Sequence, residues 1–424
     1  MRFAALAFFS FVATAPLAAA GEAVTFSGTI GKLPIIVELA NGASGQYEAG
    51  RYSYMAKGAD IPLHASANGK GSVTLEEEKP CTPKLCKKAD DSQVDEAPIG
   101  AIWSLKADAA GGLAGTWKDA ESGKVLPIKL ERKGSRTLRD SDDLFDAMDP
   151  GYYPSGHPEP PVFTKKDLPY DFLKVSRPLN EGPVTNAGQL SYRMDEDSRV
   201  GLAYPTVVSL GGEDIGPINA YLAQQRLQFE IPAFTCLSRA YLGFAWSGFD
   251  GEGTSGFDGG GQVTVEHLSP RLIGISESGS FYCGGAHPDN FTDHRLADAR
   301  TGQALVPEKL LKGWVAKDDS GNIIDPATAA KDAIITWGPD DELAAYVNSH
   351  RDKMDADSEQ DCGYDDLVKQ NLAVYFTQDS LVFTLQGLPH VIFACTYDML
   401  SVPLKDARPL LTDAGAKYFA ELDN

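Results

Sequence analysis

Residues 21–133 are divided into short apolar or alternating segments by glycine- and asparagine-containing turns, and no other feature constrains the fold as much. No stretch with the 3.6-residue period of an amphipathic helix interrupts this pattern. Turn pairs such as Asn41-Gly42 and Asn68-Gly69 favour tight connections between neighbouring strands. We therefore predict an all-β antiparallel meander, closed into a small barrel or folded as a sandwich, with strands at residues 24–30, 33–39, 51–55, 61–64, 72–75, 102–106, 114–117 and 126–130.

Two irregular segments mark the limits of this first domain. Residues 76–98 are polar and contain Cys81 and Cys86, which predicts a long, disulfide-pinned loop between two strands. Residues 134–166 are acidic and then rich in proline. Proline disrupts helix interiors and central strands, so we interpret this stretch as a semi-rigid linker without a regular helix or central strand. The first domain is therefore expected to span residues 21–133.

Residues 167–424 mix two kinds of pattern. The spacing of apolar residues and helix-start signals predicts helices at 215–228, 326–336 and 339–350. Alternating segments predict strands between them, including one at 242–246. The order does not follow a strict strand–helix–strand alternation, which predicts an α+β domain with a mainly antiparallel sheet. The chain as a whole is thus expected to be α+β.

The start of the chain has the pattern of an export signal. Arg2 follows Met1, residues 3–14 are almost wholly apolar, and Ala18-Ala19-Ala20 fits a small-residue cleavage site. We predict a signal peptide at residues 1–20, cleaved before Gly21. The apolar run is too short for a comfortable membrane span, and no later segment reaches the required length. The mature protein is expected to be periplasmic or secreted, without a transmembrane segment.

The six cysteines agree with export. An even count in an exported chain predicts three disulfides, although other connectivities are open. A zinc site is the alternative, but the spacing of the first two cysteines has no matching second pair, so we expect no metal ligation by cysteine. Order along the chain suggests the pairs Cys81–Cys86, Cys236–Cys283 and Cys362–Cys395.

The charge balance excludes one class of partner. The chain has 38 Lys and Arg against 59 Asp and Glu, a net charge of −21. Removal of the signal peptide leaves 37 basic against 59 acidic residues, a net charge of −22. Such a surface repels phosphate backbones, so we do not expect nucleic-acid binding. It favours solubility and encounter with basic partners.

A motif in the second half resembles a known bacterial domain. Tyr282-Cys283-Gly284-Gly285-Ala286-His287 is similar to the Tyr-x-Gly-Gly-Ala-His motif of an extracytoplasmic domain of unknown function. That domain occurs in lysozyme-sensing anti-sigma factors and beside the catalytic domain of some peptidoglycan deacetylases. Residues 296–305 resemble its next element, and residues 371–385 and 396–403 resemble its closing strands. The similarity covers roughly residues 170–412.

The resemblance implies a non-catalytic ligand-binding module, because some members of the family bind lysozyme. Two departures limit what it implies. This chain has no transmembrane anchor or sigma-binding part, and it lacks the metal-binding Asp and His motifs of a polysaccharide deacetylase. Neither signalling nor deacetylation is therefore expected.

The glycine-containing motif is the candidate binding site. Two glycines permit positive φ and a close backbone approach beside the imidazole of His287. The histidine could hydrogen-bond a ligand together with its neighbours, or it could hold the turn by bonding a buried carbonyl. The candidate binding residues are Tyr282, Gly284, Gly285, His287 and Asp289.

Metal binding and catalysis are the alternatives. His287, Asp289, Asp293 and His294 place four possible ligands within a short stretch, but the spacing matches no standard motif, so we expect neither a metal nor a cofactor. No Gly-x-Ser-x-Gly nucleophile motif is present. We expect a non-catalytic cell-envelope binding protein whose partner is a basic protein such as lysozyme or a cell-wall glycan. The alternative is an exported hydrolase acting on peptidoglycan or another envelope polymer, for which no spacing singles out a pair of carboxylates.

Overall fold

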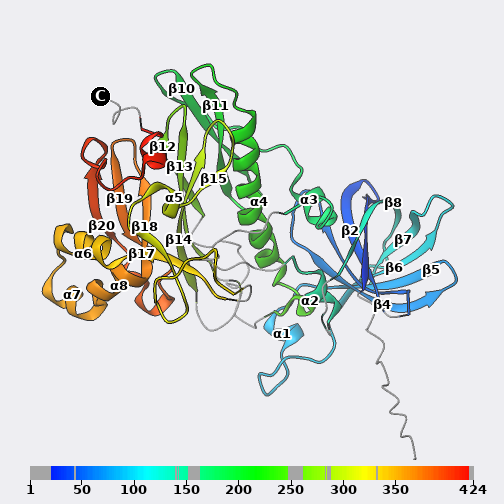
Figure 1. The fold of residues 1–424 in the computed structure, drawn as a ribbon. Coiled ribbons are helices and arrows are strands. Elements are labelled where there is room, and N and C mark those ends of the chain that lie inside the picture. Colours follow the sequence, from blue (N-terminus) through cyan, green and yellow to red (C-terminus); the bar gives the residue numbers. More distant parts are fainter. Residues whose placement is uncertain are drawn as a thin grey trace, which may run out of the picture.

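A computed structural model describes residues 21–42, 44–138, 141, 143–150, 163–246, 261–281, 283, 288–330 and 333–419. The expected signal peptide lies outside this range. Within it the structure is mostly antiparallel sheet with a smaller share of helix, and the N-terminal part is a closed eight-stranded barrel (Figure 1). The fold is therefore α+β with a small barrel, as the sequence patterns predict.

The barrel is an up-and-down meander in which each strand pairs with the next in sequence and β8 closes on β1. Closure leaves no free strand edge. The alternation that predicted the strands also determines the packing, because alternate residues point into the barrel. The strands are β1 (Glu22–Ile30), β2 (Leu33–Asn41), β3 (Tyr47–Tyr54), β4 (Ile61–Gly69), β5 (Ser72–Glu78), β6 (Ile99–Ala107), β7 (Leu113–Asp119) and β8 (Val125–Thr137).

Side chains fill the barrel interior. Trp103 and Tyr52 are fully buried there, in a core to which all eight strands contribute apolar or aromatic residues. Trp103 and Trp117 lie opposite each other on β6 and β7, and both indole N–H groups donate to the same carboxylate oxygen of Glu77 at 2.7 Å. Burial raises the pKa of Glu77. These tryptophans therefore serve the barrel core.

The segments around the barrel add two short helices. Between β5 and β6 the polar insertion contains α1 (Pro83–Cys86) and the Cys81–Cys86 disulfide, as expected. The expected boundary at residue 133 falls within β8. The expectation that residues 134–166 hold no regular helix is wrong for their acidic part, which forms α2 (Leu144–Met148). Its N-cap, Asp143, accepts from the N–H of Phe145, and its apolar side chains pack on the barrel.

The second unit consists of small antiparallel sheets packed with helices. Its first part contains α3 (Pro169–Val175), then β9 (Val184–Ala187), β10 (Leu190–Asp197) and β11 (Leu202–Leu210) in one sheet. A long helix, α4 (Gly216–Ser238), and the 3-10 turn η1 (Leu242–Phe244) follow. The next sheet is formed by β12 (Gln262–Leu268), β13 (Leu272–Phe281), β14 (Asp289–Asp298) and β15 (Ala304–Leu305).

The C-terminal part packs a last sheet against several short helices, with one continuous apolar core between them. The sheet is made of β18 (Leu372–Phe376), β19 (Ser380–Leu385) and β20 (Asp398–Pro403). Around it lie α5 (Pro307–Leu310), β16 (Trp314–Lys317), β17 (Thr336–Pro339), α6 (Asp341–His350), α7 (Ala356–Cys362), α8 (Tyr364–Asn371), η2 (His390–Cys395), η3 (Leu404–Asp406) and α9 (Asp413–Ala416).

Three sequence predictions for this unit need correction. No helix forms over the described part of 326–336, where Asp325 holds a turn by accepting from the N–H of Ala327 at 2.9 Å. The described residues of that stretch are not buried, so no apolar face stabilises a helix. Residues 242–244 of the strand predicted at 242–246 form η1 instead. The helix predicted at 215–228 extends to Ser238 despite Pro232, because buried residues continue along it.

Charged side chains fill the junction between the barrel and α3. Arg51 on the outer face of β3 donates to Glu38 at 2.8 Å, to Asp60 at 3.1 Å and to Asp171 of α3 at 2.9 Å. Lys174 of α3 reaches both carboxylate oxygens of Asp60, at 2.9 and 3.0 Å. All five side chains are almost completely buried.

Two further groups complete this junction network. Arg136 of β8 donates to both oxygens of Glu38, at 2.8 and 3.1 Å. The hydroxyl of Tyr170 donates to Asp60 at 2.6 Å, and the Arg51 guanidinium lies 4.2 Å from the centre of the Tyr170 ring. Three acids thus face three bases, so the buried charges balance. Because α3 supplies two of the charges, the network binds the barrel to the chain that follows it.

Candidate functional site

The candidate binding motif lies at the turn between β13 and β14. Tyr282, Gly284, Gly285 and His287 lie outside the residues that the structure describes. Of Asp289 only the backbone is described, at the start of β14 opposite Phe281. The structure therefore shows the strands that carry the motif and leaves the expected roles of its side chains as predictions.

A disulfide attaches this turn to the long helix. Cys283, inside the motif, is bonded to Cys236 in the last turn of α4, with a Cα–Cα separation of 4.9 Å. The other two expected pairs, Cys81–Cys86 and Cys362–Cys395, are also formed. The pairing predicted from the order of the cysteines is thus confirmed, and the motif is tied to a fixed point of the fold.

One face of the β12–β14 sheet becomes polar toward the motif. The end of this face that lies away from the motif is apolar, because Leu272 and Leu296 belong to the C-terminal core. Toward the turn the side chains on this face are four hydroxyls, one amide and one imidazole, all of them partly or fully exposed. The strand register places them side by side as Thr264–Ser276–His294 and Gln262–Ser278–Thr292. We call these six residues the polar face.

His294 is the most constrained member of the polar face. Its Nδ1 lies 2.7 Å from the hydroxyl oxygen of Ser276. The ring of Tyr375, from β18, stacks on it with centroids 4.2 Å apart and planes nearly parallel, and the Tyr375 hydroxyl donates to Asp398 at 2.9 Å. Burial lowers the pKa of His294 to about 4. The imidazole is therefore neutral near pH 7, with one nitrogen that can donate and one that can accept.

The opposite face of the same hairpin is ionic and packed. Glu277 accepts from Arg295 Nε at 2.7 Å and from the hydroxyl of Tyr204, which belongs to β11. Asp293 accepts from Gln386 at 2.8 Å, and burial raises its pKa to about 6. These groups bond one another within the protein and have no direct access to the polar face.

This geometry bears on the metal alternative. Asp293 and His294 are consecutive in β14, and successive strand residues point to opposite faces. Their contacts agree, because Asp293 bonds Gln386 whereas His294 bonds Ser276. The two side chains therefore do not converge. Within the described parts of the chain, no group of three or more His, Cys, Asp or Glu side chains is arranged to hold a metal ion.

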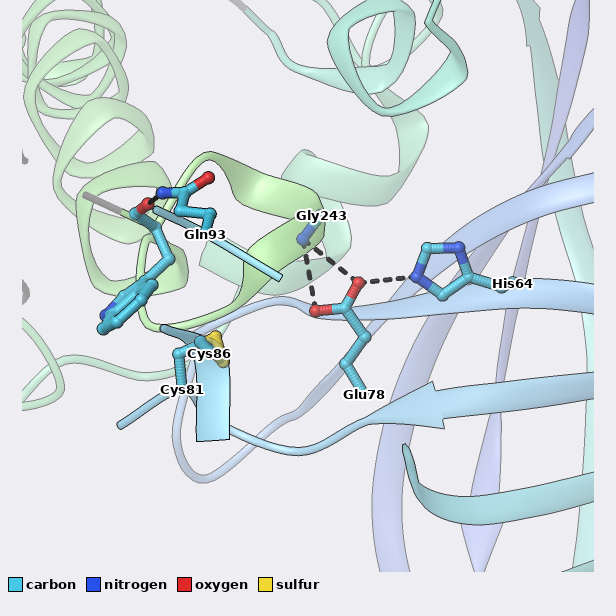
Figure 2. Close-up of a disulfide and its surroundings, with 7 residues drawn as sticks. His64, Glu78, Cys81, Cys86, Gln93 and Gly243 are labelled. Carbon is cyan, nitrogen blue, oxygen red and sulfur yellow. Dashed lines mark hydrogen bonds and ion pairs between the residues drawn. A yellow bond between two sulfur atoms is a disulfide. The ribbon is translucent and has the colours of Figure 1, made fainter. Parts of the chain in front are cut away.

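The barrel insertion fixes the segment that follows α4 (Figure 2). The buried carboxylate of Glu78 accepts from the N–H of Gly243 at 3.1 and 3.2 Å and lies 2.5 Å from His64 Nε2. Beside the Cys81–Cys86 disulfide, the Gln93 side-chain amide donates to the backbone carbonyl of Trp246. The first domain thus holds the chain close to the point where Cys236 is attached to the motif.

The polar face was missed in the sequence, although a signal for it exists. Along β13 the half-buried Ser276 and Ser278 alternate with the buried Ile275 and Glu277, and neither serine carries a charge. This alternation shows which side chains share a face. It does not show that the face stays uncovered, which depends on how far the β18–β20 sheet extends over it.

Comparison with known proteins adds no further assignment. Neither a scan against protein-family models nor a search of curated proteins found a match to the chain. The resemblance to the lysozyme-sensing and deacetylase-associated domain stays a prediction. Among the described residues, no helix combines the length and the apolar character needed to cross a membrane.

Proposed function

We propose that the chain is an exported, non-catalytic binding protein of the cell envelope and that the polar face binds a cell-wall glycan. The observation that carries the proposal is the row of uncharged donors and acceptors on β12–β14, leading to the candidate motif turn. A glycan presents many hydroxyls and few charges, so it is matched by side chains that both donate and accept hydrogen bonds. Tyr375 adds an aromatic surface at the edge of this face.

The ionisable groups near the polar face bear on the hydrolase alternative. A hydrolase needs a free base or nucleophile that converges on the substrate. Nδ1 of His294 contacts the Ser276 hydroxyl, which is the contact that a serine nucleophile makes with its base, and Asp398 accepts from Tyr375. Asp293 faces the other side of the sheet. Glu266, which adds to the effect of burial and Asp398 in raising the pKa of Tyr375, is a further carboxylate near this face. Binding and hydrolysis would therefore use the same side chains differently, and the release of soluble fragments in the test below separates them.

The net charge of −21 favours a second ligand class, a basic protein such as lysozyme. Charge of this size accelerates encounter with a cationic partner, and the effect weakens as salt increases. The two ligands are distinguishable, because the glycan needs the polar face whereas long-range attraction depends on the whole surface.

The test is co-sedimentation of the mature protein with insoluble peptidoglycan sacculi. We expect the wild type to sediment and Gln262→Ala/Thr264→Ala to bind about tenfold more weakly, since two lost hydrogen bonds contribute roughly 0.5–1.5 kcal/mol each. Both side chains are exposed on β12, so the fold should be unaffected. Ser104→Ala/Thr116→Ala, two exposed positions on the barrel, is the matched control.

Four outcomes separate the hypotheses. Sedimentation that is weakened only by the β12 variant supports glycan binding at the polar face. Binding to immobilised lysozyme at low salt, equal in both variants, would assign the basic-protein ligand instead. Release of soluble fragments from the sacculi would indicate a hydrolase. Absence of binding to either ligand would overturn the proposal.

A further inference from the structure

A groove of about 400 Å³ lies on the outside of the barrel, beside the end of α3. It is far from the polar face in sequence and is formed by different elements, namely β1, β2, β8, the residue after β3, and α3. Its volume falls within the range of small-molecule sites, and such sites occur preferentially at interfaces between units.

The strand register explains why a groove forms here. Lys129, Thr29 and Pro34 are neighbours across β8, β1 and β2, and Met55 extends this row through its N–H bond to the Pro34 carbonyl at 3.1 Å. The next row on the same outer face contains Glu131, Ser27 and Ile36.

The helix ends before it covers these rows. α3 packs over the deeper junction network and stops at Val175, so that Leu173 and Ser176 form one wall of the groove. Beyond the helix end, the outer face of the barrel is left open.

The lining combines aliphatic side chains with hydroxyl groups. Pro34, Ile36, Met55 and Leu173 supply aliphatic surface, and burial of such surface against a ligand is favourable. Ser27, Thr29 and Ser176 add hydroxyl groups to the lining of the groove. This combination fits a ligand with an apolar body and a polar head.

The charged side chains around the groove determine which charge the polar head of the ligand should carry. Glu131 is already paired, with Lys133 at 2.7 Å. The side chain of Lys129 makes neither a hydrogen bond nor an ion pair with any residue that the structure describes. Arg177, next to Ser176, donates to the Met55 carbonyl at 2.7 Å and is paired with no carboxylate in the described parts of the chain. On a protein of net charge −21, the groove is thus flanked by unneutralised cations.

We propose that this groove binds an amphiphilic monocarboxylate, with the aliphatic part against Pro34, Met55 and Leu173 and the carboxylate at Lys129. A charge-assisted hydrogen bond from the Lys129 ammonium would hold the carboxylate. The site is independent of the proposed glycan-binding face, so either can fail without the other.

The test uses 11-(dansylamino)undecanoic acid as a fluorescent probe and its undecanol analogue as the uncharged counterpart. We expect saturable binding of the acid with a blue-shifted emission. Lys129→Met should weaken binding of the acid by about tenfold and leave the alcohol within about twofold, because only the acid loses a charge-assisted bond. Lys118→Met, an exposed lysine on β7 outside the groove, is the matched control.

A second pair of variants tests the location. Ser176→Trp should fill the groove and abolish binding of both probes, whereas Thr116→Trp on β7 should not. Thr29→Trp fills the same groove from β1 and keeps the test decisive if Ser176→Trp does not fold. The proposal is overturned if the acid shows no saturable binding, if Lys118→Met weakens it as much as Lys129→Met, or if the groove-filling variants still bind.

Discussion

Replacement of Arg51 tests whether the buried charges at the junction stabilise the fold as a balanced set. Arg51 is 2 % exposed and donates to three carboxylates, from β2, from the start of β4 and from α3. Arg51→Met keeps most of the side-chain length and removes the charge. Two bases, Lys174 and Arg136, then remain against three buried acids.

The size of the expected effect follows from this imbalance. Removing one partner from a buried ionic group costs about 3–5 kcal/mol, since the remaining charge loses compensation without regaining water. Burial already raises the pKa of Asp171 although Arg51 and Lys174 lower it. Among the three buried acids, Asp171 is therefore the one whose negative charge should be most destabilised when Arg51 is removed. Arg51→Met/Asp171→Asn should therefore be less destabilised than Arg51→Met alone, although it carries one more change.

Urea unfolding, followed by circular dichroism and by tryptophan fluorescence, measures the free energy of unfolding. The control is Arg132→Met, because Arg132 is exposed and lies 3.7 Å from Glu22, and such surface pairs contribute at most about 1 kcal/mol. A cost below about 1 kcal/mol for Arg51→Met would refute the reasoning. So would a double variant whose loss equals the sum of the two single losses.

Two further predictions concern other parts of the fold. Cys236→Ala/Cys283→Ala should lower the free energy of unfolding by about 4 kcal/mol, and Cys81→Ala/Cys86→Ala should lower it by only about 2 kcal/mol. The reason is that the first disulfide closes a far longer loop, since the two sequence separations are 47 and 5. Urea midpoints under oxidising conditions check this ranking, and equal losses would contradict it. Burial raises the pKa of Glu230 from 4.5 to about 7, so the folded state holds a proton that the unfolded state releases between those values. The stability from this group is complete below pH 4.5 and is lost as pH rises through 7, by about 3 kcal/mol in all. The difference in unfolding free energy between wild type and Glu230→Gln should change by that amount from about pH 4 to about pH 8, and a constant difference would show that Glu230 does not titrate in this range.

The barrel could be predicted from sequence because its strands follow one another and pair with their neighbours. Alternation shows which residues face inward, and the turn residues separate the strands. The pairing of cysteines in chain order was also correct, since each cysteine is bonded to its neighbour in the order of cysteines along the chain.

The junction network could not be predicted in the same way. Charged residues on the outer face of a strand usually indicate a solvated surface. Arg51 is buried because Asp171 and the rest of α3 cover it from 120 residues away in sequence. The wrongly predicted helix at 326–336 shows the same limit, because its start signals were local whereas a helix also needs an apolar surface to pack on. Local patterns therefore identified the elements, and tertiary contacts decided which surfaces remained open.

The end of α4 connects these long-range contacts to the candidate site. Within five residues, Cys236 is bonded to the motif turn, the Ser238 hydroxyl accepts from the N–H of Asp60 at 2.7 Å, and the Ala240 carbonyl accepts from the N–H of Cys81 at 2.8 Å. Asp60 is itself held by Arg51 and Lys174. A displacement of the barrel relative to α4 would therefore strain the chain that carries the motif. The same short segment thus anchors both the barrel and Cys283.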